Sequence, residues 1–223
     1  MNYRAVIFDL DGTLLDTVDD LADSMNAALK HWGFPEHTAS DYKRLIGNGL
    51  RNLAEVSLPG PNRDDETIDC CLSYMRAEYE KRWSEKTRPY PGIPELLDEL
   101  ARRQIKMAVL SNKAHTFTRK IIETLLPDWK FDAVFGERLS IPRKPDPQTS
   151  FEIAGLLDIP VEEFIFLGDS GVDMKTAHAA GMLPVGALWG FRPMEELKEN
   201  GAKFLISKPL ELLKLPGEIG NVE

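Results

Sequence analysis

The sequence predicts an α/β protein: a doubly wound parallel sheet with helices on both faces, interrupted near its start by an inserted helical segment. Three observations lead to this fold. A continuous apolar run, Ala5–Phe8, is typical of a strand covered on both faces. Apolar residues between positions 16 and 87 recur at steps of three and four, which indicates helices. From Ile93 onward, strand-like and helix-like patterns alternate, as they do around a parallel sheet.

The first strand ends in an acidic stretch, Asp9-Leu10-Asp11-Gly12-Thr13. In extended backbone Asp9 and Asp11 would point to the same side, and Gly12 allows a sharp turn after them. Two neighbouring carboxylates repel each other unless a cation or a shared proton offsets the charge. A calcium loop would follow a helix and would place its glycine differently. The alternatives are therefore a polar turn or a catalytic site at the carboxyl end of the strand, where open α/β sheets bind ligands.

Residues 16–87 are expected to form helices with no strand. The first helix carries an apolar stripe made of Val18, Leu21, Met25, Ala28 and Trp32. Ser40 and Asp41 can cap a short second helix, which stops at Gly47-Asn48-Gly49, and a third runs from about Leu50 to Ser57. A long fourth helix carries the stripe Ile68, Leu72, Met75, Tyr79 and Trp83.

A proline-rich connector, Arg88-Pro89-Tyr90-Pro91-Gly92, follows the helical segment and indicates a domain boundary. We therefore expect a core domain made of residues 1–15 and 88–223, and a helical domain made of residues 16–87. Strands of the core are predicted at residues 106–110, 133–135, 164–167, 183–186 and 204–206. Helices are predicted from Ile93 and at residues 116–126, 147–157, 172–180, 195–199 and 210–214.

Four polar features follow strands of the predicted sheet. They are Asp9 with Asp11, Ser111-Asn112, Lys144-Pro145, and Gly168-Asp169-Ser170 with Asp173. The carboxyl ends of parallel strands lie at one edge of a sheet, so these features are expected to meet there. Acids for a hard metal ion, a hydroxyl and a lysine for an anion suit phosphoryl transfer, which depends on positioning and charge neutralisation.

Composition narrows the function classes. The chain has 223 residues and a net charge of -9, which argues against nucleic-acid binding because that needs a basic face. The two cysteines, Cys70 and Cys71, are adjacent, so they form neither a disulfide framework nor a zinc site. No signal peptide or membrane-spanning stretch is recognisable, so no membrane partner and a cytoplasmic location are expected.

The four features together resemble the motifs of the haloacid dehalogenase superfamily of phosphatases, in order and over essentially the whole chain. The resemblance implies that Asp9 is the nucleophile and Asp11 the general acid and base. It implies a Mg²⁺ ion held by Asp9, the backbone carbonyl of Asp11 and Asp169, with Asp173 as metal support or as a partner of Lys144. Phosphate-binding roles follow for Ser111, the Asn112 amide and Lys144, and Thr13 would steady the first loop.

The helical segment resembles the superfamily's four-helix cap, and Ile46-Gly47-Asn48-Gly49 resembles the substrate loop of bacterial phosphoglycolate phosphatases. Gly47 and Asn48 are therefore candidate substrate contacts, and Arg51 is a further candidate because an anionic leaving group would need a cation. We expect a Mg²⁺-dependent phosphatase that acts on a small phosphorylated metabolite, with 2-phosphoglycolate as the first substrate to test, in a monomer or homodimer. The alternatives are a pyrophosphatase, a nucleotide or sugar-phosphate phosphatase, a β-phosphoglucomutase-like phosphotransferase, and a non-catalytic binding protein.

Overall fold

The computed structural model describes residues 2–216 and 218–219. The chain divides into two compact units. The core unit comprises Met1–Leu15 with Pro89–Glu223, and the helical unit comprises Asp16–Arg88. Each unit is described by itself. No helix in the described part of the chain is long and apolar enough to cross a membrane.

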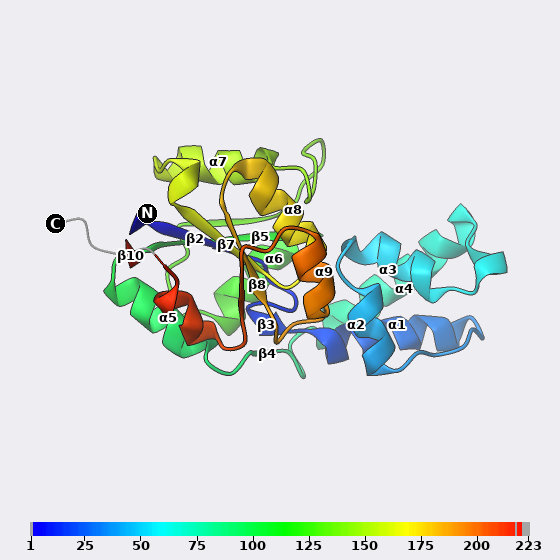
Figure 1. Cartoon of the computed structure of the whole chain (residues 1–223). Coiled ribbons are helices and arrows are strands. Elements are labelled where there is room, and N and C mark those ends of the chain that lie inside the picture. Colours follow the sequence, from blue (N-terminus) through cyan, green and yellow to red (C-terminus); the bar gives the residue numbers. More distant parts are fainter. Residues whose placement is uncertain (1, 217, 220–223) are drawn as a thin grey trace. The chain divides into compact units, whose positions relative to one another are not determined.

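The core unit contains a six-stranded sheet in the order β6-β5-β2-β7-β8-β9, and every pair of neighbouring strands is parallel (Figure 1). Its strands are β2 (Ala5–Phe8), β5 (Lys106–Ala114), β6 (Ala133–Glu137), β7 (Phe164–Gly168), β8 (Leu183–Ala187) and β9 (Phe204–Ile206). The predicted fold class is confirmed. All of β2 is buried at the centre of the sheet, which explains why its sequence carries no polar residue.

Helices lie on both faces of this sheet. They are α5 (Ile93–Arg102), α6 (His115–Leu125), α7 (Gln148–Leu157), α8 (Gly171–Ala180) and α9 (Met194–Glu199), with short 3-10 helices η2 (Val161–Glu163) and η3 (Pro209–Lys214). On one face, Ile7 and Phe166 pack with Ile153 of α7 and Ala177 of α8. The amphipathic helix α5 lies on the other side of the sheet (Figure 1). Burial on both faces fixes the sheet as the core of this unit.

The order of the strands reverses at β2. From β2 the chain first builds β5 and β6 on one side, and then β7, β8 and β9 on the other. In open α/β sheets, ligands bind beyond the carboxyl ends of the strands at this kind of reversal. The residues that follow β2, β5 and β7 are therefore placed at the expected position for a ligand site.

Two expectations about the core unit were wrong. The strand predicted at residues 106–110 continues to Ala114, with a register shift between Leu110 and Ala114. The last helix is a 3-10 helix, η3. A two-stranded sheet that was not predicted also forms, between β1 (Asn2–Tyr3) and β10 (Glu218–Ile219).

The helical unit contains α1 (Val18–His31), α2 (Ala39–Leu45), α3 (Gly49–Ser57), the 3-10 helix η1 (Gly60–Asn62) and α4 (Asp65–Arg82). Helices α1 and α4 pack on each other through buried residues such as Met25 and Met75. Of the two residues expected to cap α2, Asp41 does so by completing a capping box, but its partner and the N-cap is Thr38, not Ser40. Trp32 is 48% exposed because α1 ends one residue before it.

Two short strands, β3 (Leu15–Asp16) and β4 (Arg88–Pro89), pair with each other where the chain enters and leaves the helical unit. Inside the unit, the buried carboxylate of Asp20 holds the end of the returning segment. It accepts hydrogen bonds from the Lys86 amide at 3.1 Å, the Thr87 amide at 2.9 Å and the Thr87 hydroxyl at 2.7 Å. These three donors satisfy a carboxylate that is fully excluded from water.

Candidate active site

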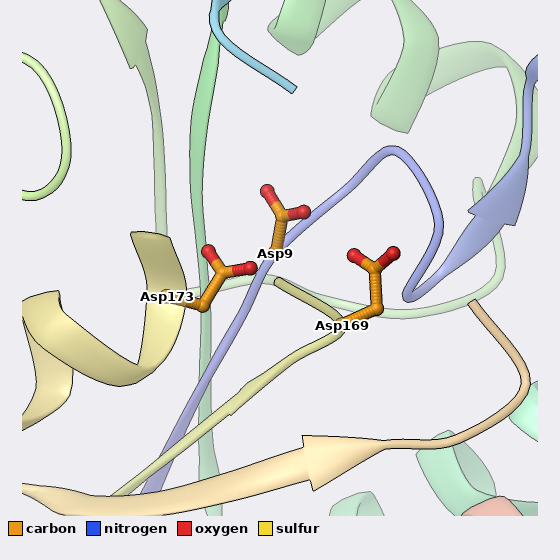
Figure 2. Close-up of side chains that lie close together, drawn as sticks. All are labelled: Asp9, Asp169 and Asp173. Atoms are coloured by element: carbon orange, nitrogen blue, oxygen red, sulfur yellow. The ribbon is translucent and has the colours of Figure 1, made fainter. Parts of the chain in front are cut away.

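Three buried aspartates lie together at the carboxyl ends of β2 and β7. Asp9 follows β2, Asp169 follows β7, and Asp173 belongs to the first turn of α8 (Figure 2). Each offers a carboxylate oxygen, and these oxygens all lie within 4.8 Å of one another. Carboxylate oxygens are the ligands that hard divalent cations prefer, so the chemistry of this set fits such an ion.

Lys144 joins two of these aspartates. Its Nζ donates to Asp9 Oδ1 at 2.7 Å and to Asp173 Oδ1 at 2.6 Å, and its side chain is 4% exposed. Asp173 Oδ2 accepts from the amide of Ser170 at 3.1 Å and from its hydroxyl at 2.6 Å, in a capping box that begins α8. Both oxygens of Asp173 therefore have partners in the protein.

Burial and mutual repulsion govern the charges of this cluster. Burial raises the pKa of Asp9 well above its usual range, and the Lys144 cation offsets only part of that effect. Burial, reinforced by the Asp173 carboxylate, raises the pKa of Asp169 to about 7. Burial also disfavours the charge of Lys144, but the carboxylates of Asp173 and Asp9 outweigh it and raise the pKa of Lys144. Three carboxyl groups thus share one lysine, and without a further cation their burial favours protonation of Asp9 and Asp169.

Asp11 takes no part in this cluster of carboxylates. Its carboxylate instead forms an ion pair with Lys113, a residue of β5, whose Nζ lies 2.9 and 3.0 Å from the two oxygens. The sequence interpretation overlooked Lys113, because the strand was expected to end at Leu110. The only signal available was a lysine two positions after Ser111.

Ser111 and Asn112 lie in the irregular part of β5 and are buried. The hydroxyl of Ser111 accepts a hydrogen bond from the Lys113 amide at 3.1 Å. The side-chain amide of Asn112 donates to the Lys144 carbonyl at 3.1 Å. Asn112 therefore ties the segment after β6 to the end of β5, which brings two of the predicted features together.

A fifth segment, after β8, also reaches the site. The Phe191 amide donates to Asp169 Oδ2 at 2.7 Å, and the Thr13 hydroxyl donates to Asp169 Oδ1 at 3.2 Å. The indole N–H of Trp189 donates to the Thr13 carbonyl at 3.0 Å, so the same segment also holds the loop that carries Thr13. Both oxygens of Asp169 are thus oriented by the protein. Sequence reasoning did not place this segment in the site, because its contact with Asp169 comes from a backbone amide and depends on no side chain.

The family model described as "Haloacid dehalogenase-like hydrolase" matches residues 6–187 of the chain. This span contains Asp9, Lys144 and Asp169 together with the strands that position them. The chain belongs to the haloacid dehalogenase-like hydrolase family. The family and the enzyme class expected from the sequence, a hydrolase of the phosphatase type, are thereby confirmed.

Members of this family that resemble the chain match it over nearly its whole length. A phosphoglycolate phosphatase of Aquifex aeolicus is 31% identical over 95% of this chain and 96% of its own. A phosphoglycolate phosphatase of Nitrosospira multiformis is 31% identical over 95% of each chain. A crystal structure from Lactobacillus delbrueckii subsp. bulgaricus, described as a candidate phosphoglycolate phosphatase, has a TM-score of 0.90 at 29% identity and covers 95% of this chain and 97% of its own.

Three other predicted site residues, Gly47, Asn48 and Arg51, belong to the helical unit. Gly47 and Asn48 are exposed in the turn between α2 and α3. Arg51, on α3, forms ion pairs with Asp65 and Asp69 of α4. The charge of Arg51 is thus partly neutralised within its own unit.

Replacing Gly190 with alanine should disturb the orientation of Asp169. An added Cβ would lie 2.2 Å from Asp169 Cβ and 2.5 Å from the Gly12 carbonyl oxygen, so the backbone must shift. We expect a loss of about 1–3 kcal/mol in the free energy of unfolding. Thermal unfolding of the variant and of wild type measures this loss. Gly155→Ala is the control, because nothing lies within 4 Å of its added Cβ.

Proposed function

We propose that this family member is a Mg²⁺-dependent phosphatase that hydrolyses a small phosphorylated metabolite through an aspartyl-phosphate on Asp9. One observation carries the proposal: at the end of β2, a buried carboxylate is held by a lysine beside two further buried carboxylates. A lone structural ion pair would not need these additional acids. They are costly to bury unless a cation joins them.

Whether Mg²⁺ fits this site depends on which oxygen atoms the residues there can offer to the ion. Asp9 and Asp169 present carboxylates to a common space, and the Asp11 carbonyl would complete the protein's contribution. Asp173 is paired directly with the Lys144 cation at 2.6 Å, whereas Asp169 accepts from a neutral hydroxyl and a backbone amide, so we assign Asp173 to positioning Lys144. When bound, the ion would neutralise charge on the phosphoryl oxygens during transfer. Three buried carboxyl groups that share a single lysine support a divalent cation there.

Asp9 is the proposed nucleophile. Its carboxylate oxygen forms a bond to phosphorus while the bond from phosphorus to the ester oxygen breaks, and the electron pair leaves with that oxygen. Lys144 holds Asp9 Oδ1 at 2.7 Å, which fixes the direction of the other oxygen and balances charge as the phosphoryl group arrives. The hydroxyl of Ser111 and the Asn112 amide are the proposed donors to the phosphoryl oxygens.

Asp11 is the proposed acid and base. In its protonated form it gives a proton to the departing ester oxygen in the first step, and this leaves the carboxylate that is paired with Lys113. In the second step it takes a proton from the water that attacks phosphorus, and the bond between Asp9 and the phosphoryl group breaks. Thr13 contributes indirectly, since its hydroxyl orients Asp169 and its carbonyl is held by Trp189.

2-Phosphoglycolate is the proposed substrate. The names of the similar enzymes from Aquifex aeolicus and Nitrosospira multiformis support it. The helical unit would then act as a cap that reads the leaving group through the turn at Gly47 and Asn48. A cytoplasmic enzyme that acts on a soluble metabolite, without nucleic-acid or membrane partners, is consistent with the charge of -9.

Phosphate release from a panel of phosphate monoesters, pyrophosphate and nucleotides tests this proposal. We expect turnover with Mg²⁺, none after treatment with EDTA, and a preference for 2-phosphoglycolate. Activity that persists in EDTA would contradict the metal. Activity spread evenly over sugar phosphates or nucleotides would contradict the substrate while leaving the chemistry standing.

A further inference from the structure

A second buried lysine lies in the site and has no role in the reaction as described so far. Lys113 donates to both oxygens of Asp11, at 2.9 and 3.0 Å, and its side chain is 3% exposed. The Asp11 side chain is 15% exposed. The two lysines of the site thus divide the acids between them: Lys144 holds the proposed nucleophile, and Lys113 holds the proposed acid and base.

The position of Lys113 is fixed by its backbone. Its amide donates to the Ser111 hydroxyl at 3.1 Å, and its carbonyl accepts from the Thr118 hydroxyl at 3.2 Å. Gly136 lies close against the same carbonyl: a Cβ added to it would come within 2.3 Å of that oxygen. Lys113 is therefore anchored to the same short segment as the proposed phosphate-binding hydroxyl, and its charge stays beside Asp11.

Proton transfer from Asp11 requires that the leaving group lie close to Asp11, and therefore also close to the ammonium group of Lys113. A general acid must lie within about 2.6–3.2 Å of the oxygen that it protonates. The ester oxygen would thus occupy a position next to Asp11 that is comparable to the one held by Lys113 Nζ. A substituent on the carbon bonded to this oxygen then lies within reach of the lysine. In 2-phosphoglycolate this substituent is a carboxylate.

The position of Lys113 favours it for this role, because each candidate cation is already paired with a carboxylate and Lys113 is paired with Asp11. Lys144 is shared between Asp9 and Asp173. Arg51, which the sequence suggested as a substrate contact, is paired with Asp65 and Asp69 within the helical unit. Lys113 is the buried cation beside the group that handles the leaving oxygen, and a buried lysine binds a carboxylate through a charge-assisted hydrogen bond.

We propose that Lys113 forms a carboxylate subsite, so that the enzyme selects phosphate monoesters in which the carbon next to the ester oxygen carries a carboxylate. The inference rests on the proposed phosphatase function and names the substrate class of that same site. The core unit would then contribute to the choice of leaving group through Lys113, in addition to any contacts made by the helical unit. Lys113 would bind the carboxylate of the substrate and, after transfer, that of the released hydroxy acid.

Two matched substrates test the subsite. 2-Phosphoglycolate and 2-hydroxyethyl phosphate have the same ester linkage, but a hydroxymethyl group replaces the carboxylate in the second. We expect wild type to prefer the first. Lys113→Met should lower kcat/KM for 2-phosphoglycolate by about 10- to 100-fold more than for 2-hydroxyethyl phosphate, because a hydrogen bond between charged groups is lost. Lys113→Arg should keep part of the preference, and Lys106→Met, at an exposed position of β5, should keep all of it.

The outcomes separate this inference from the proposed function. If Lys113→Met lowers both activities by the same factor, Lys113 only orients Asp11, and the subsite is wrong. If wild type hydrolyses both substrates equally well, the subsite is wrong whether or not the variant folds, while the phosphatase assignment stands. If wild type releases phosphate from no ester in the panel, the proposed function fails and the inference falls with it. Circular dichroism of each variant confirms that it is folded.

Discussion

Replacing Asp9 with asparagine should lower kcat for phosphate release by at least about 10⁴-fold, since removal of an essential nucleophile commonly costs this much or more. The amide has nearly the same shape as the carboxylate but is a far weaker nucleophile. The substitution also removes a carboxylate whose charge is disfavoured by burial, since burial raises the pKa of Asp9 well above its usual range. The folded state should therefore be retained, and phosphate release with saturating Mg²⁺ is the measurement.

The control for this variant is Asp158→Asn. Asp158 is exposed at the end of α7 in the left-handed backbone region, which asparagine tolerates well. Its activity should match that of wild type. Mass spectrometry after acid quenching adds an independent readout, because only protein with Asp9 can carry a phosphoryl group there. Undiminished turnover by Asp9→Asn would contradict Asp9 as the nucleophile, whatever the effect on stability.

Among the proposed variants, Lys144→Met should lower the free energy of unfolding the most. The lysine is the shared partner of Asp9 and Asp173, and breaking a buried ion pair from one side costs about 3–5 kcal/mol in the free energy of unfolding. Activity should also fall sharply, because the charge on the nucleophile loses its fixed partner. Chemical denaturation at pH 8 without Mg²⁺ measures the loss of stability.

The destabilisation of Lys144→Met should depend on pH with a defined sign. Without the lysine, the buried carboxylates lose the cation that lowers their pKa values, so the folded state binds protons more readily than the unfolded chain. Stability should therefore recover as pH falls from about 8 toward about 4, where aspartates of the unfolded chain also become protonated. A constant difference from wild type over this range would contradict the electrostatic explanation.

Lys106→Met serves as the matched control in these denaturation experiments. Lys106 forms an ion pair with Asp132 at 2.9 Å, but its side chain is 47% exposed. An exposed pair of this kind contributes at most about 1 kcal/mol. Loss of equal stability in the two variants would mean that the burial of Lys144 has no special consequence.

The positions of the core acids could be predicted because they depend on a strong local pattern. A wholly apolar strand of four residues can only be buried in the middle of a sheet, so the polar residues after it must lie at the edge where ligands bind. The same reasoning applies to Asp169 after β7. No long-range information was needed for either residue.

The contacts that orient these acids could not be predicted in the same way. Lys113 and Asp11 are 102 positions apart, and a local backbone irregularity after Leu110 decides where the lysine lies. The hydrogen bond from the Phe191 amide to Asp169 involves no side chain of Phe191, so its residue type carries no signal. Trp32 was assigned to the buried stripe because periodicity does not reveal that the helix ends before it.

The pairing of β3 with β4 has a consequence for how new enzymes can arise from this chain. Paired strands lie about 5 Å apart, so the polypeptide leaves the core unit and returns to it at almost the same point. A tight turn could join Leu15 to Pro89 and bridge that gap. Recombination at this junction could therefore exchange one insert for another without moving any strand of the six-stranded sheet. The insert could then change during evolution while the residues of the core unit keep their positions.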